Sequence, residues 1–213
     1  MAESETGLSR RDREREQHRI DILDAAELVF VRDGFAAKIE TIAKAAEYSV
    51  GSLYNFFPSK EELFKNVLLR ISQLRIEGVE KALPGLLADP WAGLRTVCHL
   101  WLAHHLRHGD FLHIAHSMRF RCAGALFSPD DPVERQLRAN FEAYRERLTR
   151  YFAALAATPE ARPIDPSILF TAFEGYIRSS LFAFSRMHSG DGKGDVSALE
   201  ADVHKALCVL FRK

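Results

Sequence analysis

Apolar residues recur every three to four positions along most of the chain, a spacing that is typical of amphipathic helices. The first such pattern covers residues 20–30 and ends at Gly34, a residue suited to a left-handed helix terminus. Two short patterns follow at residues 39–46 and 50–57, before Pro58 interrupts the chain. We find no convincing run that alternates between apolar and polar residues, as a half-buried strand would. The pattern predicts an all-α protein.

Helix-start signals divide the rest of the chain. Ser59, followed three residues later by Glu62, has the sequence of a capping box and begins a long apolar pattern over residues 59–83. Three Asp-Pro pairs each offer a capping carboxylate followed by proline at the first helical position. Together with the remaining apolar patterns they predict helices near residues 90–108, 110–124, 132–157, 166–188 and 195–212. The expected fold therefore has about nine helices joined by short loops.

Composition narrows the class of protein without indicating a function. Of the 213 residues, 47% are hydrophobic and 27% are charged, as in ordinary globular proteins. No segment has the ~18 uninterrupted apolar residues of a membrane span, and the N-terminus lacks a signal-peptide core, so we expect a cytoplasmic protein without a membrane partner. Cys98, Cys122 and Cys208 are too widely spaced for a disulfide framework or a zinc knuckle. The 29 basic residues balance the 29 acidic ones, so DNA binding would require a local motif.

Such a motif lies within residues 34–64. Two short helices joined by a tight turn form a helix-turn-helix, whose second helix enters the major groove of DNA. At the start of that helix, Ser49 occupies the N-cap position and the small Gly51 allows close approach to a phosphate. On its next turn, Tyr54 and Asn55 present polar groups. This pattern favours a DNA-binding role.

The segment resembles the DNA-binding domain of the tetracycline-repressor (TetR) family of transcriptional regulators. The similarity covers roughly residues 17–66 and rests on Gly34-Phe35, Ile42-Ala43, Ala46, the run Ser49 to Tyr54, Phe57, and the run Ser59 to Phe64. The resemblance implies an all-α homodimer with an N-terminal three-helix DNA-binding domain and a C-terminal helical bundle for ligand binding and dimerisation. It further implies binding to a palindromic double-stranded operator, as a repressor released by a small ligand.

Carried over position by position, the resemblance assigns a DNA-binding surface to Ser49, Val50, Gly51, Ser52, Tyr54, Asn55, Phe56 and Lys60. The recognition helix contains no Lys or Arg, so base readout would depend on Asn55, hydroxyl groups, thymine methyl contacts and DNA shape.

Three positions depart from the family pattern. Glu47 stands where members usually have glycine, Tyr48 replaces a small aliphatic residue, and the Thr that usually starts the first helix of the motif is absent. A non-glycine residue in a left-handed turn costs roughly 1–2 kcal/mol, so a strained turn that weakens DNA binding is expected.

The same resemblance divides the chain into a flexible N-terminal arm at residues 1–16, a DNA-binding domain at residues 17–66 and a ligand-binding and dimerisation domain at residues 67–213. The arm interleaves arginines with acidic residues. It is either a mobile segment that contacts phosphates or a minor groove, or a helical extension held by side-chain pairs.

Six histidines lie between His99 and His116. Pairs spaced by three or four residues could bind a transition metal, line a pocket for an organic ligand, or be ordinary surface and core residues. No metal signature is complete, so neither a metal nor a cofactor is predicted. Residues expected to bind a small apolar or aromatic effector are Trp101, His105, His108, Met118, Arg121, Phe141 and Phe173.

The last two predicted helices are rich in apolar residues. In the TetR family two such helices from each subunit form a four-helix dimer interface, and this assigns the interface to Phe173, Ile177, Leu181, Phe184, Leu199, Val203, Leu207 and Leu210. The alternative is that these side chains pack within one chain.

The leading hypothesis is a dimeric, ligand-responsive, sequence-specific DNA-binding regulator. An enzyme is not expected, because no nucleophile motif, Glu-x-x-His pair or glycine-rich phosphate loop is present. The alternative is a helical-bundle ligand- or metal-binding protein with weakened DNA binding.

Overall fold

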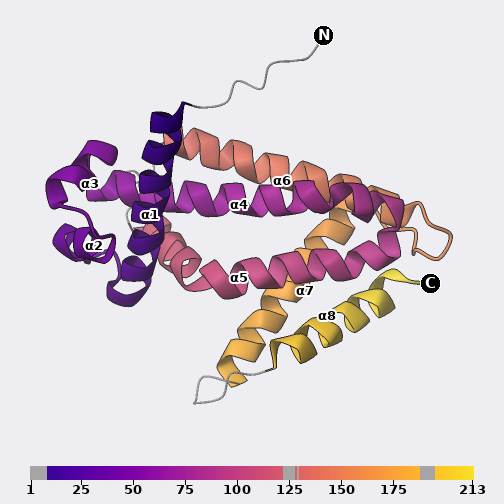
Figure 1. Cartoon of the computed structure of the whole chain (residues 1–213). Helices are drawn as coiled ribbons and strands as arrows, with labels where there is room; N and C mark the ends of the chain where they lie inside the picture. Colours follow the sequence, from indigo (N-terminus) through magenta and orange to yellow (C-terminus); the bar gives the residue numbers. More distant parts are fainter. Residues whose placement is uncertain (1–8, 122–127, 129, 188–194) are drawn as a thin grey trace, which may run out of the picture. The chain divides into compact units, whose positions relative to one another are not determined.

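The computed structural model describes residues 9–121, 128, 130–187 and 195–213. These residues form eight α-helices and no β-strand, which confirms the all-α prediction (Figure 1). The helices are α1 (Arg10–Asp33), α2 (Ile39–Ala45), α3 (Val50–Phe56), α4 (Lys60–Ala88), α5 (Pro90–Arg121), α6 (Pro132–Ala156), α7 (Pro166–Met187) and α8 (Val196–Phe211). None of the described helices is long and apolar enough to cross a membrane.

Two expected interruptions are absent. Separate helices were predicted at residues 90–108 and 110–124, but α5 is continuous and contains Gly109. Likewise α4 continues through Pro84 to Ala88 instead of ending near residue 83. Glycine and proline each weaken a helix locally, but the apolar residues on either side are buried, and this burial outweighs the local loss.

All three Asp-Pro pairs begin helices as predicted. The Asp89 carboxylate accepts a hydrogen bond from the Ala92 amide at 3.0 Å at the start of α5. Asp131 accepts from the Val133 amide at 2.7 Å before α6, and Asp165 accepts from the Ser167 amide at 2.8 Å before α7. Each carboxylate therefore satisfies a backbone donor that the helix itself leaves open.

The chain forms two compact units. Unit 1 comprises residues up to Ile71 together with Asp110–Leu137, and unit 2 comprises Ser72–Gly109 together with Arg138–Lys213. The sequence-based boundaries at 16/17 and 66/67 fall inside α1 and α4. The division into domains at 1–16, 17–66 and 67–213 stays a prediction about which segments fold independently.

An aromatic cluster holds unit 1 together. Phe30 of α1, Phe64 of α4 and Phe111 of α5 are fully buried. The ring centroids of Phe30 and Phe64 lie 5.1 Å apart, and those of Phe64 and Phe111 lie 4.8 Å apart. Leu53 and Phe57 belong to the same core. The helix-turn-helix segment is therefore anchored on α1 and on the first turns of α4.

The core of unit 2 is built from α4 to α8. Tyr151 and Phe152 of α6 pack with Phe173 of α7 and Leu207 of α8, and all four side chains are buried. The Tyr151 hydroxyl donates to the Pro90 carbonyl at 2.8 Å, so this polar group is satisfied inside the core.

Candidate DNA interface and ligand cavity

The turn between α2 and α3 has a defined geometry. The Tyr48 amide donates to the Ala43 carbonyl at 2.9 Å and the Glu47 amide donates to the Lys44 carbonyl at 3.2 Å. These two bonds form a Schellman motif, which normally has glycine at its left-handed position. Glu47 occupies that position with φ of 62°. The predicted strain at Glu47 is therefore present in the turn.

Tyr48 fixes this turn against α1. Its hydroxyl hydrogen-bonds Nδ1 of His18, and the two rings meet edge to face with centroids 5.6 Å apart. Burial, with a further contribution from the nearby Asp21 carboxylate, raises the pKa of the Tyr48 phenol. The aromatic residue that replaces the usual aliphatic one thus orients the entry to α3.

Helix α3, the second helix of the predicted helix-turn-helix, has a buried side and an exposed side. Leu53 is fully buried, whereas Tyr54 is 45% exposed and its neighbour Asn55 is also exposed. The Ser49 hydroxyl caps the helix by accepting from the Ser52 amide at 3.0 Å, as predicted. The remaining residues assigned to the DNA-binding surface are exposed or half-buried: Ser49, Val50, Gly51, Ser52 and Phe56.

Packing within the described structure does not require glycine at position 51. A Cβ atom at this position would meet only the Ser49 hydroxyl oxygen, at 4.0 Å. Because glycine weakens a helix and nothing inside the chain excludes a larger side chain, Gly51 is best explained by the close approach of another molecule.

Lys60 and the start of α2 have structural roles. The Lys60 ammonium donates to the Ala37 carbonyl at 3.3 Å and lies 4.8 Å from the centroid of the Phe35 ring. It therefore ties α4 to the loop before α2, and its contact with a DNA phosphate stays a prediction. Lys38 occupies the N-cap of α2 without a side-chain hydrogen bond, in agreement with the missing Thr.

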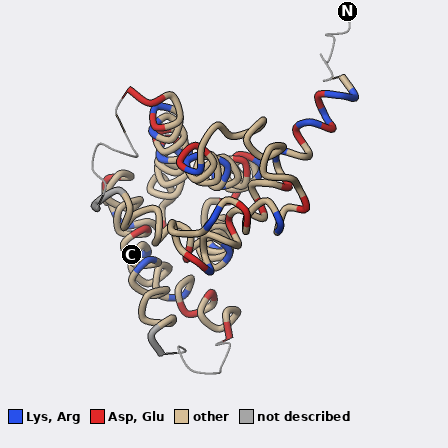
Figure 2. The backbone as a smooth tube through the Cα atoms, turned by 90° about the vertical axis from the view of Figure 1, so that its left-hand side faces the viewer, with Lys and Arg blue, Asp and Glu red and all other residues tan. Residues whose placement is uncertain are grey.

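The N-terminal charged segment is helical from Arg10 onward. Ser9 caps α1, and Arg10 pairs with Glu14 at 2.8 Å. Figure 2 shows basic and acidic positions alternating along these first turns. Residues 10–16 thus adopt the helical extension that was one of the two alternatives, while residues 1–8 of the predicted arm lie outside the described residues.

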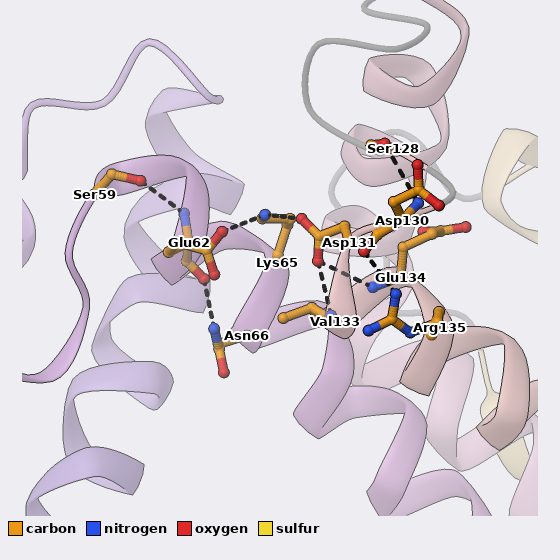
Figure 3. Close-up of polar contacts among 10 residues, drawn as sticks. All are labelled: Ser59, Glu62, Lys65, Asn66, Ser128, Asp130, Asp131, Val133, Glu134 and Arg135. Carbon is orange, nitrogen blue, oxygen red and sulfur yellow. Dashed lines mark hydrogen bonds and ion pairs between the residues drawn. The ribbon is translucent and has the colours of Figure 1, made fainter.

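A buried ion-pair network lies in unit 1. The Lys65 side chain of α4 is 6% exposed, and its ammonium contacts the carboxylates of Glu62 and Asp131 (Figure 3). Asp131 also caps α6, and the Glu62 amide donates to the Ser59 hydroxyl at 3.1 Å. One cation therefore joins the start of α4 to the start of α6.

Unit 2 contains a small cavity of about 60 Å³. Its lining comes from α4, α5 and α6, and the residues are Leu74, Arg75, Gly78, Val79, Val97, Leu100, Trp101, His104 and Tyr144. The Arg75 guanidinium lies 3.6 Å above the centre of the Tyr144 ring and donates to the Glu174 carboxylate at 2.8 Å. The cavity is mainly apolar and has a few polar groups in fixed positions, as small-molecule sites commonly do.

The residues predicted for effector binding do not gather in this cavity. Trp101 lines it, and the ring of His105 stacks on Trp101 with centroids 3.5 Å apart. The others that can be placed lie elsewhere: His108 is buried, Met118 packs against the unit 1 core, Phe141 is 49% exposed and Phe173 is fully buried in the unit 2 core. The Arg121 side chain lies outside the described part of the structure.

Two members of the histidine group are held in the neutral form. Burial, with Arg75 adding to it, lowers the pKa of His104 to about 3 and that of His105 to about 4. The described residues include no group of three or more His, Cys, Asp or Glu that could hold a metal ion. Of the three explanations left open, a neutral polar lining is the one that His104 fits.

The residues predicted for a dimer interface fall into two groups. One group is buried in the core of unit 2, which is the alternative of packing within one chain: Phe173, Ile177, Val203 and Leu207. Because these side chains are covered by their own chain, they are not available to a second copy in this conformation. The other group is half-buried or exposed: Leu181, Phe184, Leu199 and Leu210.

Sequence reasoning missed Arg75, Glu174 and Lys65. Arg75 and Glu174 each interrupt an apolar helical pattern, which is a signal of a buried ion pair. Their partnership across 99 positions could not be predicted, because many charged residues compete as partners.

Comparison with known proteins shows similarity to bacterial regulators. The family model for bacterial regulatory proteins of the tetR family matches residues 22–67. The HTH-type transcriptional repressor NicS of Pseudomonas putida is 34% identical over 115 residues, which are 54% of this chain and 53% of that protein. Over residues 22–67 the chain is therefore similar to tetR-family regulators. The chain spans about half the length of the curated relative that it matches.

Solved structures of bacterial regulators share the fold. A TetR family transcription regulator from Marinobacter aquaeolei has a TM-score of 0.67 at 19% identity, covering 94% of this chain and 99% of that one. The fatty acid degradation regulator FadR from Bacillus halodurans has a TM-score of 0.67 at 16% identity, covering 89% and 94%. At these identities the likeness shows the fold alone.

Replacing Glu47 with glycine is expected to raise the free energy of unfolding of the protein by about 1 kcal/mol, because glycine adopts a positive φ without a Cβ conflict. Urea denaturation of the full chain measures the change. Glu47→Gln is the matched control, since it keeps the strain and removes only the charge. Equal stability of the two variants would contradict the interpretation of strain.

The lowered pKa of His104 predicts a loss of stability in acid. An unfolded histidine titrates near 6.5, so between pH 6.5 and about 3 the unfolded chain binds a proton that the folded chain does not. Stability therefore falls as the pH falls through this window, and the effect vanishes above it. His104→Gln should show a shallower loss in urea denaturation series than the wild type. The exposed His113→Gln is the control, and identical pH profiles for all three proteins would refute the prediction.

Proposed function

We propose that this protein is a sequence-specific DNA-binding transcriptional regulator, which acts as a repressor and is released from DNA by a small ligand. The observation that carries the proposal is the construction of α3, where Leu53 is buried on an aromatic core while Tyr54 and Asn55 face outward. The open space around Gly51 supports it. A relative that is 34% identical over 115 residues is named an HTH-type transcriptional repressor.

Base readout by α3 would depend on few groups. The helix contains no Lys or Arg, so bidentate contacts to guanine are absent from it. The Asn55 amide can pair with adenine, the Tyr54 ring can contact a thymine methyl, and DNA shape supplies the remaining selectivity. The protein would bind DNA in the cytoplasm.

The regulator would act as a homodimer on a palindromic operator, since two-fold symmetry of the protein is mirrored in the DNA site. Exposed apolar side chains on α7 and α8 favour a second copy as the partner, and the most exposed are Ile168, Phe182, Val209 and Leu210 at 59%, 65%, 66% and 49%. These positions replace the buried Phe173, Ile177, Val203 and Leu207 in the proposed interface.

Sedimentation at micromolar concentration tests the proposed dimer. The wild type should sediment as a dimer, and Val209→Asp should sediment as a monomer.

The cavity of unit 2 is the proposed effector site. A ligand releases DNA only if it binds the DNA-incompetent conformation more tightly than the competent one. Both α4 and α5 contribute residues to unit 1 and to unit 2, so each is continuous between the two parts of the chain.

Fluorescence anisotropy with DNA flanking the gene tests the proposal. A fragment containing the operator is expected to bind at least about tenfold more tightly than a shuffled fragment, with an affinity that falls as salt rises. Asn55→Ala should lower the specific affinity about tenfold, and Glu146→Ala, an exposed residue of unit 2, should not. Equal affinity for both fragments would overturn the proposal.

A second candidate is a ligand-binding bundle with weakened DNA binding. It is favoured by the strained Glu47, whose carboxylate lies in the turn before α3, and by the absence of cations from α3. The same anisotropy experiment separates the two, because this candidate predicts weak binding with equal affinity for the operator fragment and the shuffled fragment.

A further inference from the structure

We propose that the cavity of unit 2 takes an uncharged ligand group with a hydrogen-bond acceptor, such as an amide or ketone carbonyl, and that the indole N–H of Trp101 is the donor. This inference rests on the proposed effector role of the cavity and specifies the chemistry of that effector.

The Trp101 indole supplies the first observation. Its side chain is 3% exposed and lines the cavity, and its Nε1 is a buried side-chain atom without a hydrogen-bond partner in the described structure. The other tryptophan is different, because Nε1 of Trp91 donates to the Thr158 hydroxyl at 2.9 Å. Buried polar groups are nearly always paired, so an unpaired donor beside a cavity indicates a missing acceptor.

The Trp101 ring is held in one orientation. The His105 ring stacks on it with centroids 3.5 Å apart and planes 9° apart, and Nδ1 of His105 lies 3.0 Å from the Trp101 carbonyl oxygen. The indole donor is therefore pre-positioned, which lowers the entropy that a ligand must lose to use it.

The charges around the cavity favour a neutral ligand. Arg75 is the fixed cation in the lining, and its guanidinium is already paired with Glu174, with side chains 22% and 15% exposed. A carboxylate entering the cavity would therefore bring a negative charge that this pair does not balance. An amide or ketone oxygen accepts the same hydrogen bond without that charge.

The size of the cavity limits what part of the ligand enters it. About 60 Å³ is roughly the space of two water molecules, so it accommodates one acceptor-bearing group of a few heavy atoms. Gly78 forms part of the wall, and a Cβ atom added there would lie 3.7 Å from Leu100 Cδ2, an ordinary contact. Gly78→Ala should therefore narrow the cavity without a steric clash.

Benzamide, benzoate and isopropenylbenzene provide a matched test, since they share a shape and differ in charge and in the acceptor. In Trp91→Phe protein, Trp101 is the single tryptophan, so its indole N–H gives one assigned NMR signal. Benzamide should move this proton downfield. It should also bind about tenfold more tightly than either other compound.

Two variants complete the test. Trp101→Phe keeps a large ring and removes the donor, and it should weaken benzamide binding about tenfold while leaving isopropenylbenzene unchanged. Gly78→Ala should weaken the binding of benzamide and of isopropenylbenzene. Gly85→Ala in the same helix is the control, because a Cβ atom added at Gly85 meets nothing within 4 Å.

The inference is overturned if benzamide fails to bind, if benzoate binds more tightly than benzamide, or if the indole signal of Trp101 is unmoved at saturation. DNA binding is measured without these probes, so failure of the proposed regulator function is a separate result.

Discussion

Replacement of Lys65 with methionine should lower the free energy of unfolding by about 3 kcal/mol, because two carboxylates lose their buried counter-ion. Burial alone would lower the pKa of Lys65, but hydrogen bonds from its ammonium to Asp131 and Glu62 outweigh burial and raise that pKa. The folded state therefore favours the charged lysine. Urea denaturation of the full chain near neutral pH measures the loss.

Asp131→Asn supplies the matched control for Lys65. The asparagine keeps a side-chain oxygen to cap α6 and removes the charge that Lys65 balances. The double variant Lys65→Met, Asp131→Asn should regain part of the lost stability, since the less buried Glu62 is then the remaining charge. A single Lys65→Met variant as stable as the wild type would show that the network contributes nothing.

The network also predicts how stability depends on pH. Burial would raise the pKa of Asp131, but its hydrogen bonds from Lys65 and from the amides of Val133 and Glu134 lower it below the ordinary 3.8. A carboxyl group whose pKa is lowered by folding stabilises the protein above its unfolded pKa, and this contribution is lost as the pH falls through the folded pKa. The difference in free energy of unfolding between the wild type and Lys65→Met should therefore become smaller in strong acid.

Local rules predicted the helices and the DNA-binding motif well. The three Asp-Pro pairs, the Ser49 cap and the burial of Leu53 depend on residues close in sequence, where capping chemistry and helical periodicity apply directly. Glu47 was identified as a non-glycine residue at a glycine position, and its φ of 62° has the same local origin. In each case the residues that determine the local structure lie within one short segment of the sequence.

Long-range contacts could not be predicted in the same way. Whether Phe173 packs inward or against a second copy depends on which helix covers it, and an apolar residue at helical spacing is compatible with both. The partnerships of Lys65 with Asp131 and of Arg75 with Glu174 join residues 66 and 99 positions apart. Helix α4 likewise continues through Pro84 because the neighbouring residues are buried, although proline itself disfavours a helix.

Gly51→Ala should separate DNA binding from folding. The free energy of unfolding is expected to rise by about 0.5–1 kcal/mol, because alanine is a better helix former and a Cβ atom meets only the Ser49 hydroxyl oxygen, at 4.0 Å. Affinity for the operator is expected to fall about tenfold, because the added methyl group occupies space that the proposed contact with DNA needs. Urea denaturation and anisotropy titration measure the two changes on the same protein.

A graded series makes the Gly51 prediction specific. Gly51→Leu should keep the stability of the alanine variant and lower operator affinity about a hundredfold, since leucine projects further from the exposed surface of α3. Gly85→Ala in α4 is the matched control, because this exposed helical glycine also has open space around a new Cβ atom. It should gain similar stability and bind DNA like the wild type. If Gly51→Leu also binds like the wild type, the amino-terminal turn of α3 does not face the operator, and the assignment of Ser49, Val50, Gly51 and Ser52 to the DNA-binding surface is wrong.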